Sequence, residues 1–244
     1  MATDGGPRNA APGSRRKHGL PAPRGQEPLG SAGSNWLTPS PARNAACATS
    51  RCTDTAPADA KQLVTGGALC LAAAVTELHT PRLTLHAIDT AEGERIVARH
   101  AGVGDVWADD FPFDGDIIGV TAFLRAASAH GNQRPFGHYR ITRKADGQAI
   151  GGIGFKGQPQ NGCAEIGYGL APSARGQGYA AEALTAILTV AAAHGVSRVV
   201  ADTDKDNVAS QRTLERAGFR QLVANGDLCL YEVLLDDSSR SSQP

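Results

Sequence analysis

The feature that most constrains the fold is an abrupt change of composition near residue 62. Residues 1–60 contain no Ile, Val, Phe or Tyr, and their large apolar side chains are three Leu and one Trp. Seven Gly and eight Pro occupy positions in this stretch that would interrupt a helix or a strand. Such a segment cannot bury enough apolar surface to offset the entropy lost on ordering. We therefore predict that residues 1–62 form a disordered tail rich in Gly, Pro and Ala.

The rest of the chain has the composition of one folded domain with short flanks. The Ala-rich residues 63–77 are expected to form a short linker or helix. Residues 78–235 mix apolar runs with turn signals and are expected to hold the folded α/β domain. The Ser-rich residues 236–244 are expected to form a frayed tail.

Charge and aromatic content argue against two classes of partner. The 24 Lys and Arg residues balance 24 Asp and Glu residues, so the formal net charge is zero. Such a chain as a whole is not a polybasic binder of nucleic acid or of a membrane surface. Aromatic residues make up 5% of the sequence, which is low for a protein that stacks on bases. No apolar stretch approaches the roughly 18 residues of a membrane helix, so neither a nucleic acid nor a membrane is expected as a partner.

The cysteines and histidines show no metal-site spacing. The five cysteines include no CxxC pair, and the seven histidines include no HExxH motif. An odd number of dispersed cysteines favours reduced thiols over a disulfide framework. The expectations are a cytoplasmic protein and no bound metal.

Hydrophobic periodicity within the domain predicts strands and helices in mixed order. Alternating apolar residues and turn signals between them predict strands, and the two longest runs of helix formers predict helices. The predicted strands are residues 80–88, 139–142, 149–155, 164–170, 198–201 and 228–235, and the main predicted helices are residues 179–194 and 207–217.

Three glycine patterns compete as ligand-binding loops. Gly151-Gly152-Ile153-Gly154 lies inside a predicted strand with no helix following at dinucleotide-binding spacing, so it is interpreted as close backbone contact within a sheet. Gly167-Tyr168-Gly169 suggests a strand that is bulged, splayed or approached by a ligand. Only the run from Arg175 to Ala180 stands between a strand and a long helix.

That third run carries the chemistry of an anion site. A helix begins with unpaired N–H groups and a partial positive charge, and glycines allow those groups to converge on one anion. A diphosphate fits such a site. No GK[ST] triplet follows the loop, so the nucleotide-binding P-loop is excluded.

Three motifs in register resemble the GNAT acetyltransferases, in particular the branch that includes the ribosomal-protein N-terminal acetyltransferases. The loop Arg-Gly-Gln-Gly-Tyr-Ala is similar to the family's diphosphate motif, and the strand before it begins Glu-Ile-Gly-Tyr-Gly-Leu at Glu165. The run from Asn207 to Phe219 resembles the family's Asn…Ser…Gly-Phe helix, and Thr80-Pro81-Arg82-Leu83 resembles the first strand of that branch. The resemblance covers about residues 78–235.

The resemblance implies an α/β GNAT fold, whose mostly antiparallel central sheet is splayed between two parallel strands and flanked by helices. It also implies acetyl-CoA as the co-substrate, with its pantetheine paired to the strand backbone near Leu170 and contacted by Asn207. The diphosphate would lie on the loop that follows. The cofactor-binding residues implied in this way are Leu170, Arg175, Gly176, Gln177, Gly178, Tyr179, Ala180 and Asn207.

Acetyl transfer requires a neutral amine, and an aliphatic amine has a pKa near 10.4, so a base is needed. Glu165 is the acid best placed for this role, with a sheet-edge glutamate as the alternative. Glu182 falls in the family's Ala-Glu-Ala-Leu pattern and is interpreted as structural. Where many family members carry a tyrosine that protonates the leaving thiolate, this chain has Leu214, so Ser210 on the same helix is the candidate acid, with a capping serine as the alternative.

Two functional classes remain open. One is an N-acetyltransferase whose acceptor is a protein N-terminus or a small-molecule amine, acting as a monomer or homodimer. The other is a catalytically silent coenzyme A-binding regulatory or interaction module. Trp107, Phe111 and Phe113 lie where the family builds its acceptor site, and the sequence leaves open whether they belong to the core or to the wall of that site.

Overall fold

The computed structural model describes residues 1, 2 and 76–235. The expectations for the tail, for a helix before residue 76 and for residues 236–244 lie outside the described part of the chain.

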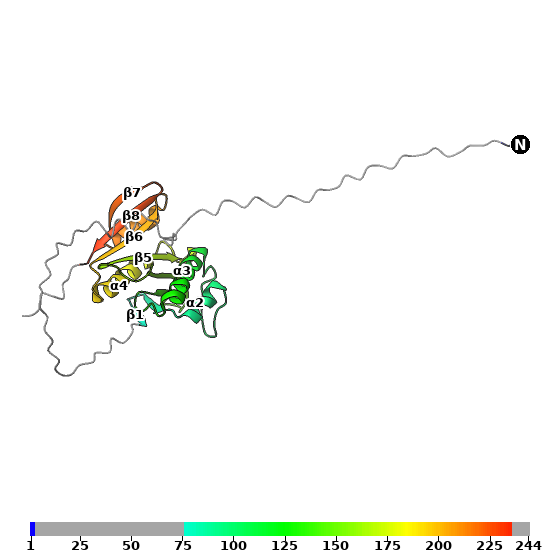
Figure 1. Ribbon diagram of the computed structural model, residues 1–244. Helices are drawn as coiled ribbons and strands as arrows, with labels where there is room; N and C mark the ends of the chain where they lie inside the picture. Colours follow the sequence, from blue (N-terminus) through cyan, green and yellow to red (C-terminus); the bar gives the residue numbers. More distant parts are fainter. Residues whose placement is uncertain (3–75, 236–244) are drawn as a thin grey trace, which may run out of the picture. The chain divides into compact units, whose positions relative to one another are not determined.

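The domain is built on one eight-stranded sheet flanked by helices (Figure 1). The strand order is β1-β2-β3-β4-β5-β6-β8-β7, and every neighbouring pair is antiparallel except β5 and β6. The strands are β1 Glu77–His79, β2 Leu83–Ala87, β3 His138–Arg143, β4 Ala149–Phe155, β5 Cys163–Leu170, β6 Arg198–Asp204, β7 Arg220–Asn225 and β8 Leu228–Leu234. The helices are α2 Thr90–Val97, α3 Asp114–His130, α4 Tyr179–Ala193 and α5 Val208–Arg216, with the 3-10 turn η1 Pro172–Ala174 before α4.

This arrangement confirms the predicted α/β class and its single parallel pair, with three corrections to the strands. The strand predicted over residues 80–88 begins only at Leu83, because Pro81 and Arg82 form the bend of a hairpin between β1 and β2. The sequence prediction missed β1, which has three residues, and also β7, which lies at the edge of the sheet and is paired only to β8. β6 extends three residues beyond the predicted end, to Asp204.

The two parallel strands separate after a short common stretch. β5 and β6 pair only from Cys163 opposite Arg198 to Glu165 opposite Val200. Beyond that point β5 stays paired to β4 on its other side, and β6 stays paired to β8. The backbone edges of residues 166–170 and 201–204 therefore face a gap inside the sheet, which is the predicted splay.

Side chains of β5 point alternately to two helical layers. Gly169 faces the start of α3, where a Cβ would come within 2.5 Å of the Phe113 ring, so only glycine allows this close approach. Tyr168 and Leu170 face the opposite side, toward α4 and α5.

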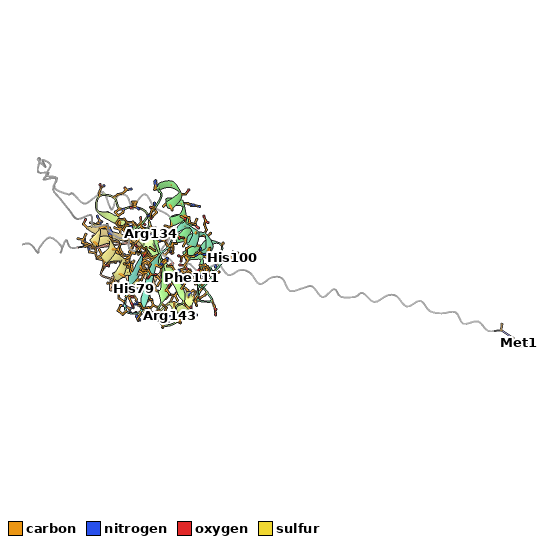
Figure 2. All side chains as sticks on the ribbon, turned by 90° about the horizontal axis from the view of Figure 1, so that it is seen from below. Met1, His79, His100, Phe111, Arg134 and Arg143 are labelled. Carbon is orange, nitrogen blue, oxygen red and sulfur yellow. The ribbon has the colours of Figure 1, made fainter. Side chains whose placement is uncertain are left out.

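Phe111 is 6% exposed and lies within the body of the domain, whereas the exposed His100 lies at its margin (Figure 2).

Two ionisable groups are buried between α3 and the sheet. His138 at the start of β3 is 3% exposed, and its ring lies 6.5 Å from that of Phe123 in α3, measured between centroids. Burial lowers the pKa of His138 from 6.5 to about 3. Asp116 is 1% exposed, and burial raises its pKa well above the usual value, although it accepts the N–H of Phe113. His138 is therefore neutral in the folded protein at neutral pH.

The burial of His138 predicts that this residue lowers stability in acid, while the raised pKa of Asp116 acts in the opposite direction. Between pH 6.5 and about 3 the unfolded chain binds a proton at His138 that the folded chain does not, so stability falls as pH decreases. The full effect of one group is about 1.4 kcal/mol per pH unit. Denaturant titrations between pH 7 and 4 should give a shallower decline for His138→Gln than for the wild type. The exposed His130→Gln serves as the control, and equal slopes for wild type and His138→Gln would contradict the prediction.

Candidate functional site

The predicted anion loop connects the end of β5 to the start of α4. η1 ends at Ala174, and the chain then turns through Gly176 and Gly178, whose φ angles are +77° and +79°. Such angles favour glycine, because a Cβ meets the backbone in left-handed conformations. Gly178 is the N-cap of α4, and the first N–H groups of that helix point into the turn without intrahelical acceptors.

Arg175 connects this loop to the sheet. Its Nε donates to the carbonyl oxygen of Leu170 at 2.9 Å, and its guanidinium carbon lies 5.5 Å from the centroid of the Phe113 ring. This hydrogen bond holds Arg175, the first residue of the loop, next to Leu170, the last residue of β5.

A groove of about 350 Å³ lies between this loop and α5, beside the gap in the sheet. It brings together most of the residues implied for the cofactor and one of the two candidate catalytic residues. The predicted site residues that line it are Leu170, Arg175, Gly176, Gly178, Tyr179, Ala180, Asn207 and Ser210.

Two predicted site residues do not line the groove. The side-chain amide of Gln177 donates to the carbonyl oxygen of Ser173 at 3.4 Å, and the backbone carbonyl oxygen of Gln177 accepts Nη1 of Arg82 at 2.9 Å. Glu165 lies on the side of β5 opposite to Tyr168, facing the layer that contains α3. The groove also includes Arg212 and Arg216, two exposed cations that the sequence analysis did not single out.

Asn207 is the N-cap of α5 and presents an unused donor. Its Oδ1 accepts the N–H of Ser210 at 3.1 Å, while its buried Nδ2 has no hydrogen-bond partner among the described residues. Because a buried amide is costly to leave unpaired, this group suits a ligand carbonyl or hydroxyl in the groove.

A buried hydroxyl pair lies at the floor of the groove. The Tyr168 hydroxyl lies 2.8 Å from Oγ of Ser210 and 3.2 Å from the Ser210 carbonyl oxygen. Burial raises the pKa of Tyr168, so the phenol stays protonated at neutral pH. Position 214, where many family members carry a tyrosine, is occupied by the fully buried core residue Leu214. The structure brings Tyr168 to Ser210 from β5 instead, and the Gly-Tyr-Gly sequence around it was the available signal.

Glu165 belongs to a charged cluster at the point where β5 and β6 separate. Lys156 donates to Glu165 at 3.0 Å and to Asp202 of β6 at 2.7 Å. The side chains of Lys156 and Asp202 are 8% and 2% exposed. The cluster holds two carboxylates around one ammonium, and neither Lys156 nor Asp202 was identified from the sequence.

A second cavity of about 470 Å³ lies on this α3 side of the sheet. Its walls are mostly apolar and include Ile117, Phe123, Phe136 and Phe155, and Lys156 also lines it. The cavity therefore adjoins the charged cluster that contains Glu165.

The three aromatic residues considered for an acceptor site line neither cavity. Trp107 and Phe111 meet edge to face with centroids 5.2 Å apart, and Phe113 covers Gly169. Phe111 is buried, whereas Trp107 and Phe113 are half-buried.

Residues 76–235 contain neither a cluster of metal-binding side chains nor a membrane-spanning helix. No group of three or more His, Cys, Asp or Glu side chains there is placed to hold a metal ion. No helix within residues 76–235 has the length and apolar character needed to cross a bilayer.

The charged cluster generates a stability prediction. Lys156→Met should lower the free energy of unfolding by about 3 kcal/mol, because it removes the ammonium shared by two largely buried carboxylates. The exposed Lys205→Met is the matched control, and urea denaturation at pH 7 provides the measurement. Adding Asp202→Asn to Lys156→Met should recover part of the loss. A loss below about 1 kcal/mol for Lys156→Met would mean that this ion pair contributes no more than an exposed one.

Comparison with known proteins identifies the family. Residues 71–220 match the acetyltransferase (GNAT) domain. An uncharacterized N-acetyltransferase of Bacillus subtilis (strain 168), YjdG, is 40% identical over 86 residues, which are 34% of this chain and 51% of the relative. The match thus spans about half the length of that curated relative.

Solved structures show weaker similarity. The acetyltransferase from Agrobacterium tumefaciens strain C58 is 22% identical with a TM-score of 0.46, and the match covers 72% of this chain and 100% of that one. The ribosomal L7/L12 alpha-N-protein acetyltransferase RimL, solved with coenzyme A, is 23% identical with a TM-score of 0.46, covering 65% and 97%. The assignment rests on the domain match, which covers more than half of the sequence: the chain belongs to the GNAT acetyltransferase family.

Proposed function

We propose that this protein transfers the acetyl group of acetyl-CoA directly to a primary amine, in a ternary complex. The acceptor is the N-terminus of a protein or a small-molecule amine. The observation that carries the proposal is the groove beside the gap between β5 and β6, which combines a helix N-terminus, an unpaired Asn207 donor and the Tyr168–Ser210 hydroxyl pair.

In this proposal the groove holds acetyl-CoA along its length. The diphosphate lies on the N–H groups from Gly176 to Ala180, where the helix dipole favours an anion. Gln177 contributes through its backbone, because its side chain lies outside the groove. The exposed guanidiniums of Arg212 and Arg216 add positive charge at the α5 side of the groove.

The unpaired sheet edges receive the rest of the ligand. An amide-containing pantetheine arm can bond to the backbone near Leu170 as a strand would, and Nδ2 of Asn207 can donate to it. The thioester would then approach the point where β5 and β6 meet, which is where Glu165 lies.

Glu165 acts as the base for the incoming ammonium. Glu165 and Asp202 place two carboxylates around Nζ of Lys156, at 3.0 Å and 2.7 Å, where the β5 and β6 strands separate. The cavity on the α3 side adjoins this cluster through Lys156 and gives the acceptor a route from the face opposite to the cofactor groove. Once Glu165 or a water bound to it accepts the proton, the neutral amine attacks the thioester.

Ser210 supplies the proton to the departing thiolate. Serine alone is a poor acid, but its hydroxyl lies 2.8 Å from the protonated Tyr168, which can replace the proton that Ser210 gives up. Tyr168 thereby supports Ser210 from the floor of the groove.

A panel of peptides and small amines tests the function directly. Purified protein with acetyl-CoA should release a free thiol and raise the mass of at least one primary amine by about 42 Da, which is the acetyl group less the amine hydrogen that it replaces. Binding of acetyl-CoA without transfer to any acceptor in a broad panel would instead support the silent coenzyme A-binding module.

The diphosphate site predicts the effect of Gly178→Glu. A carboxylate at the N-terminus of α4 should weaken coenzyme A binding at least tenfold, or about 1.4 kcal/mol, in calorimetry. Because the φ angle there is +79°, the substitution also strains the backbone. Gly195→Glu is the matched control: Gly195 has a φ of +78°, follows the opposite end of α4 and has open space around it. Equal coenzyme A affinity in the two variants would contradict the location of the diphosphate.

The assignment of base and acid predicts different effects for two conservative variants. Glu165→Gln should lower kcat by about 10²–10⁴-fold with little change in acetyl-CoA affinity, and higher pH should partly restore the rate by deprotonating the amine in solution. Ser210→Ala should cost less, because a thiolate leaves without a strong acid. Rates measured from pH 6 to 10 provide the comparison. A wild-type pH profile for Glu165→Gln beside an inactive Ser210→Ala would reverse the assignment.

A further inference from the structure

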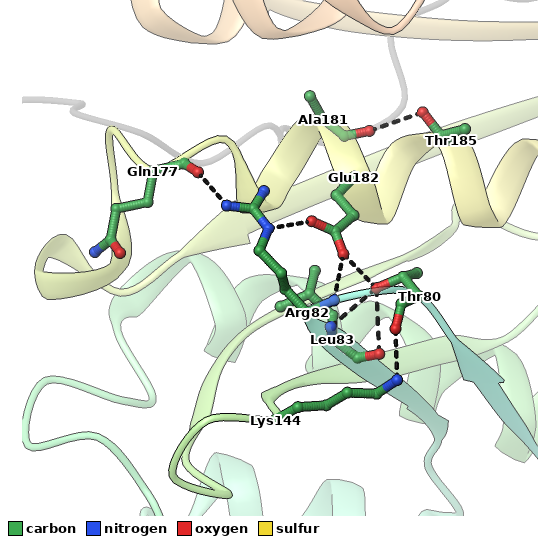
Figure 3. A network of polar contacts seen from close by, with 8 residues as sticks. All are labelled: Thr80, Arg82, Leu83, Lys144, Gln177, Ala181, Glu182 and Thr185. Atoms are coloured by element: carbon green, nitrogen blue, oxygen red, sulfur yellow. Dashed lines mark hydrogen bonds and ion pairs between the residues drawn. The ribbon is translucent and has the colours of Figure 1, made fainter.

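The first turn of α4 is bound to the bend between β1 and β2, about 100 residues away in sequence (Figure 3). Oε1 of Glu182 accepts the Thr80 hydroxyl at 2.5 Å and the backbone N–H of Arg82 at 2.9 Å, and Oε2 accepts Nε of Arg82 at 2.7 Å. Burial by itself would raise the pKa of Glu182, but these donors from Thr80 and Arg82 hold it below the usual value. The carboxylate is therefore ionised at neutral pH.

The guanidinium of Arg82 also reaches the loop that precedes the helix. Its Nη1 donates to the carbonyl oxygen of Gln177 at 2.9 Å, and its carbon lies 4.7 Å from the centroid of the Tyr179 ring. Its Nη2 is 3.5 Å from the position that a Cβ on Gly178 would occupy. One side chain thus contacts the last turn of the loop, the first residue of α4 and the acid of its first turn.

These contacts lie behind the loop and outside the cofactor groove. Neither Arg82 nor Glu182 lines that groove. The bend that carries Arg82 is itself held, because Nζ of Lys144 donates to the carbonyl of Thr80 at 2.5 Å (Figure 3). Arg82 can therefore act on a ligand in the groove only through the loop.

The contacts of Arg82 with Glu182 and with the loop before α4 should strengthen anion binding at that loop for two reasons. A loop with two glycines loses much conformational entropy when it is ordered, and a ligand that must order it binds more weakly. In addition, a carboxylate in the first turn of a helix competes with an anionic ligand for the positive end of the helix dipole. The ion pair with Arg82 neutralises Glu182 and fixes the loop at the same time.

We propose that Arg82 and Glu182 are positioning residues, which hold the Gln177–Gly178 turn in the conformation that binds the diphosphate of coenzyme A. This inference rests on the proposed function. It also changes the role of Glu182, which the sequence analysis interpreted as part of a helix pattern only.

The test separates ligands that carry the diphosphate from ligands that lack it. Arg82→Gln should raise the Kd for coenzyme A about tenfold and the KM for acetyl-CoA similarly, with kcat at saturation within twofold of wild type. The short thioester S-acetyl-N-acetylcysteamine has no diphosphate, so its kcat/KM should not change. Arg82→Lys keeps the charge but cannot form the forked contact, so it should resemble Arg82→Gln in coenzyme A affinity.

Arg99→Gln is the matched control for the loss of an exposed arginine. Arg99 is 51% exposed at its side chain against 48% for Arg82, and it also combines one ion pair, with Asp114, with a bond to one backbone carbonyl, that of Pro112. This control should bind coenzyme A as the wild type does. Hydrogen–deuterium exchange should be faster at residues 176–182 in Arg82→Gln and unchanged there in Arg99→Gln.

Glu182→Gln provides a second test if Arg82→Gln is unstable. The new side-chain amide would face Nε of Arg82, donor against donor, so the same pattern of weaker coenzyme A binding and faster exchange is expected. Unchanged coenzyme A affinity in both variants, or an equal loss with the short thioester, would overturn the positioning role while leaving the proposed function intact. A wild-type protein that does not bind coenzyme A would overturn both.

Discussion

The structure depends on the separation of two parallel strands in the middle of a sheet. β5 and β6 pair over three residues and then diverge, although each remains paired on its outer side. Backbone N–H and C=O groups in a protein interior need partners, and these inner edges receive none from each other. An extended ligand with amide groups can supply them. The groove lies beside this gap, and its lining includes Asn207, which is the N-cap of α5, and the hydroxyl pair of Tyr168 and Ser210.

The alternation of side chains along β5 separates two chemical environments at the same strand. Tyr168 and Leu170 face the groove bordered by α4 and α5. Glu165 and Gly169 face the α3 layer, one next to Lys156 and the other under Phe113. In the proposed reaction this geometry lets a thioester and an amine approach the same short stretch of strand from opposite faces. The base and the acid are then on different faces and act on different partners.

Side-chain contacts hold both the loop before α4 and the charged cluster in place. The loop before α4 is fixed to β5 through Arg175 and to the β1–β2 bend through Arg82. In the charged cluster, Lys156, which directly follows β4, bonds to Glu165 of β5 and to Asp202 of β6.

The sequence alone determined the fold class, the main helices and most of the strands. It also identified the glycine loop before α4, because left-handed turns and helix starts have strong local signatures in residues such as Gly178 and Asn207. It could not find β1, which has three residues, or β7, whose apolar residues are consecutive rather than alternating and whose pairing with β8 is irregular. The contacts of Lys156 with Asp202, of Tyr168 with Ser210 and of Arg82 with Glu182 join residues 42 to 100 positions apart. Only the tertiary structure decides such contacts, because no local pattern records which distant side chains the sheet will bring within hydrogen-bonding distance.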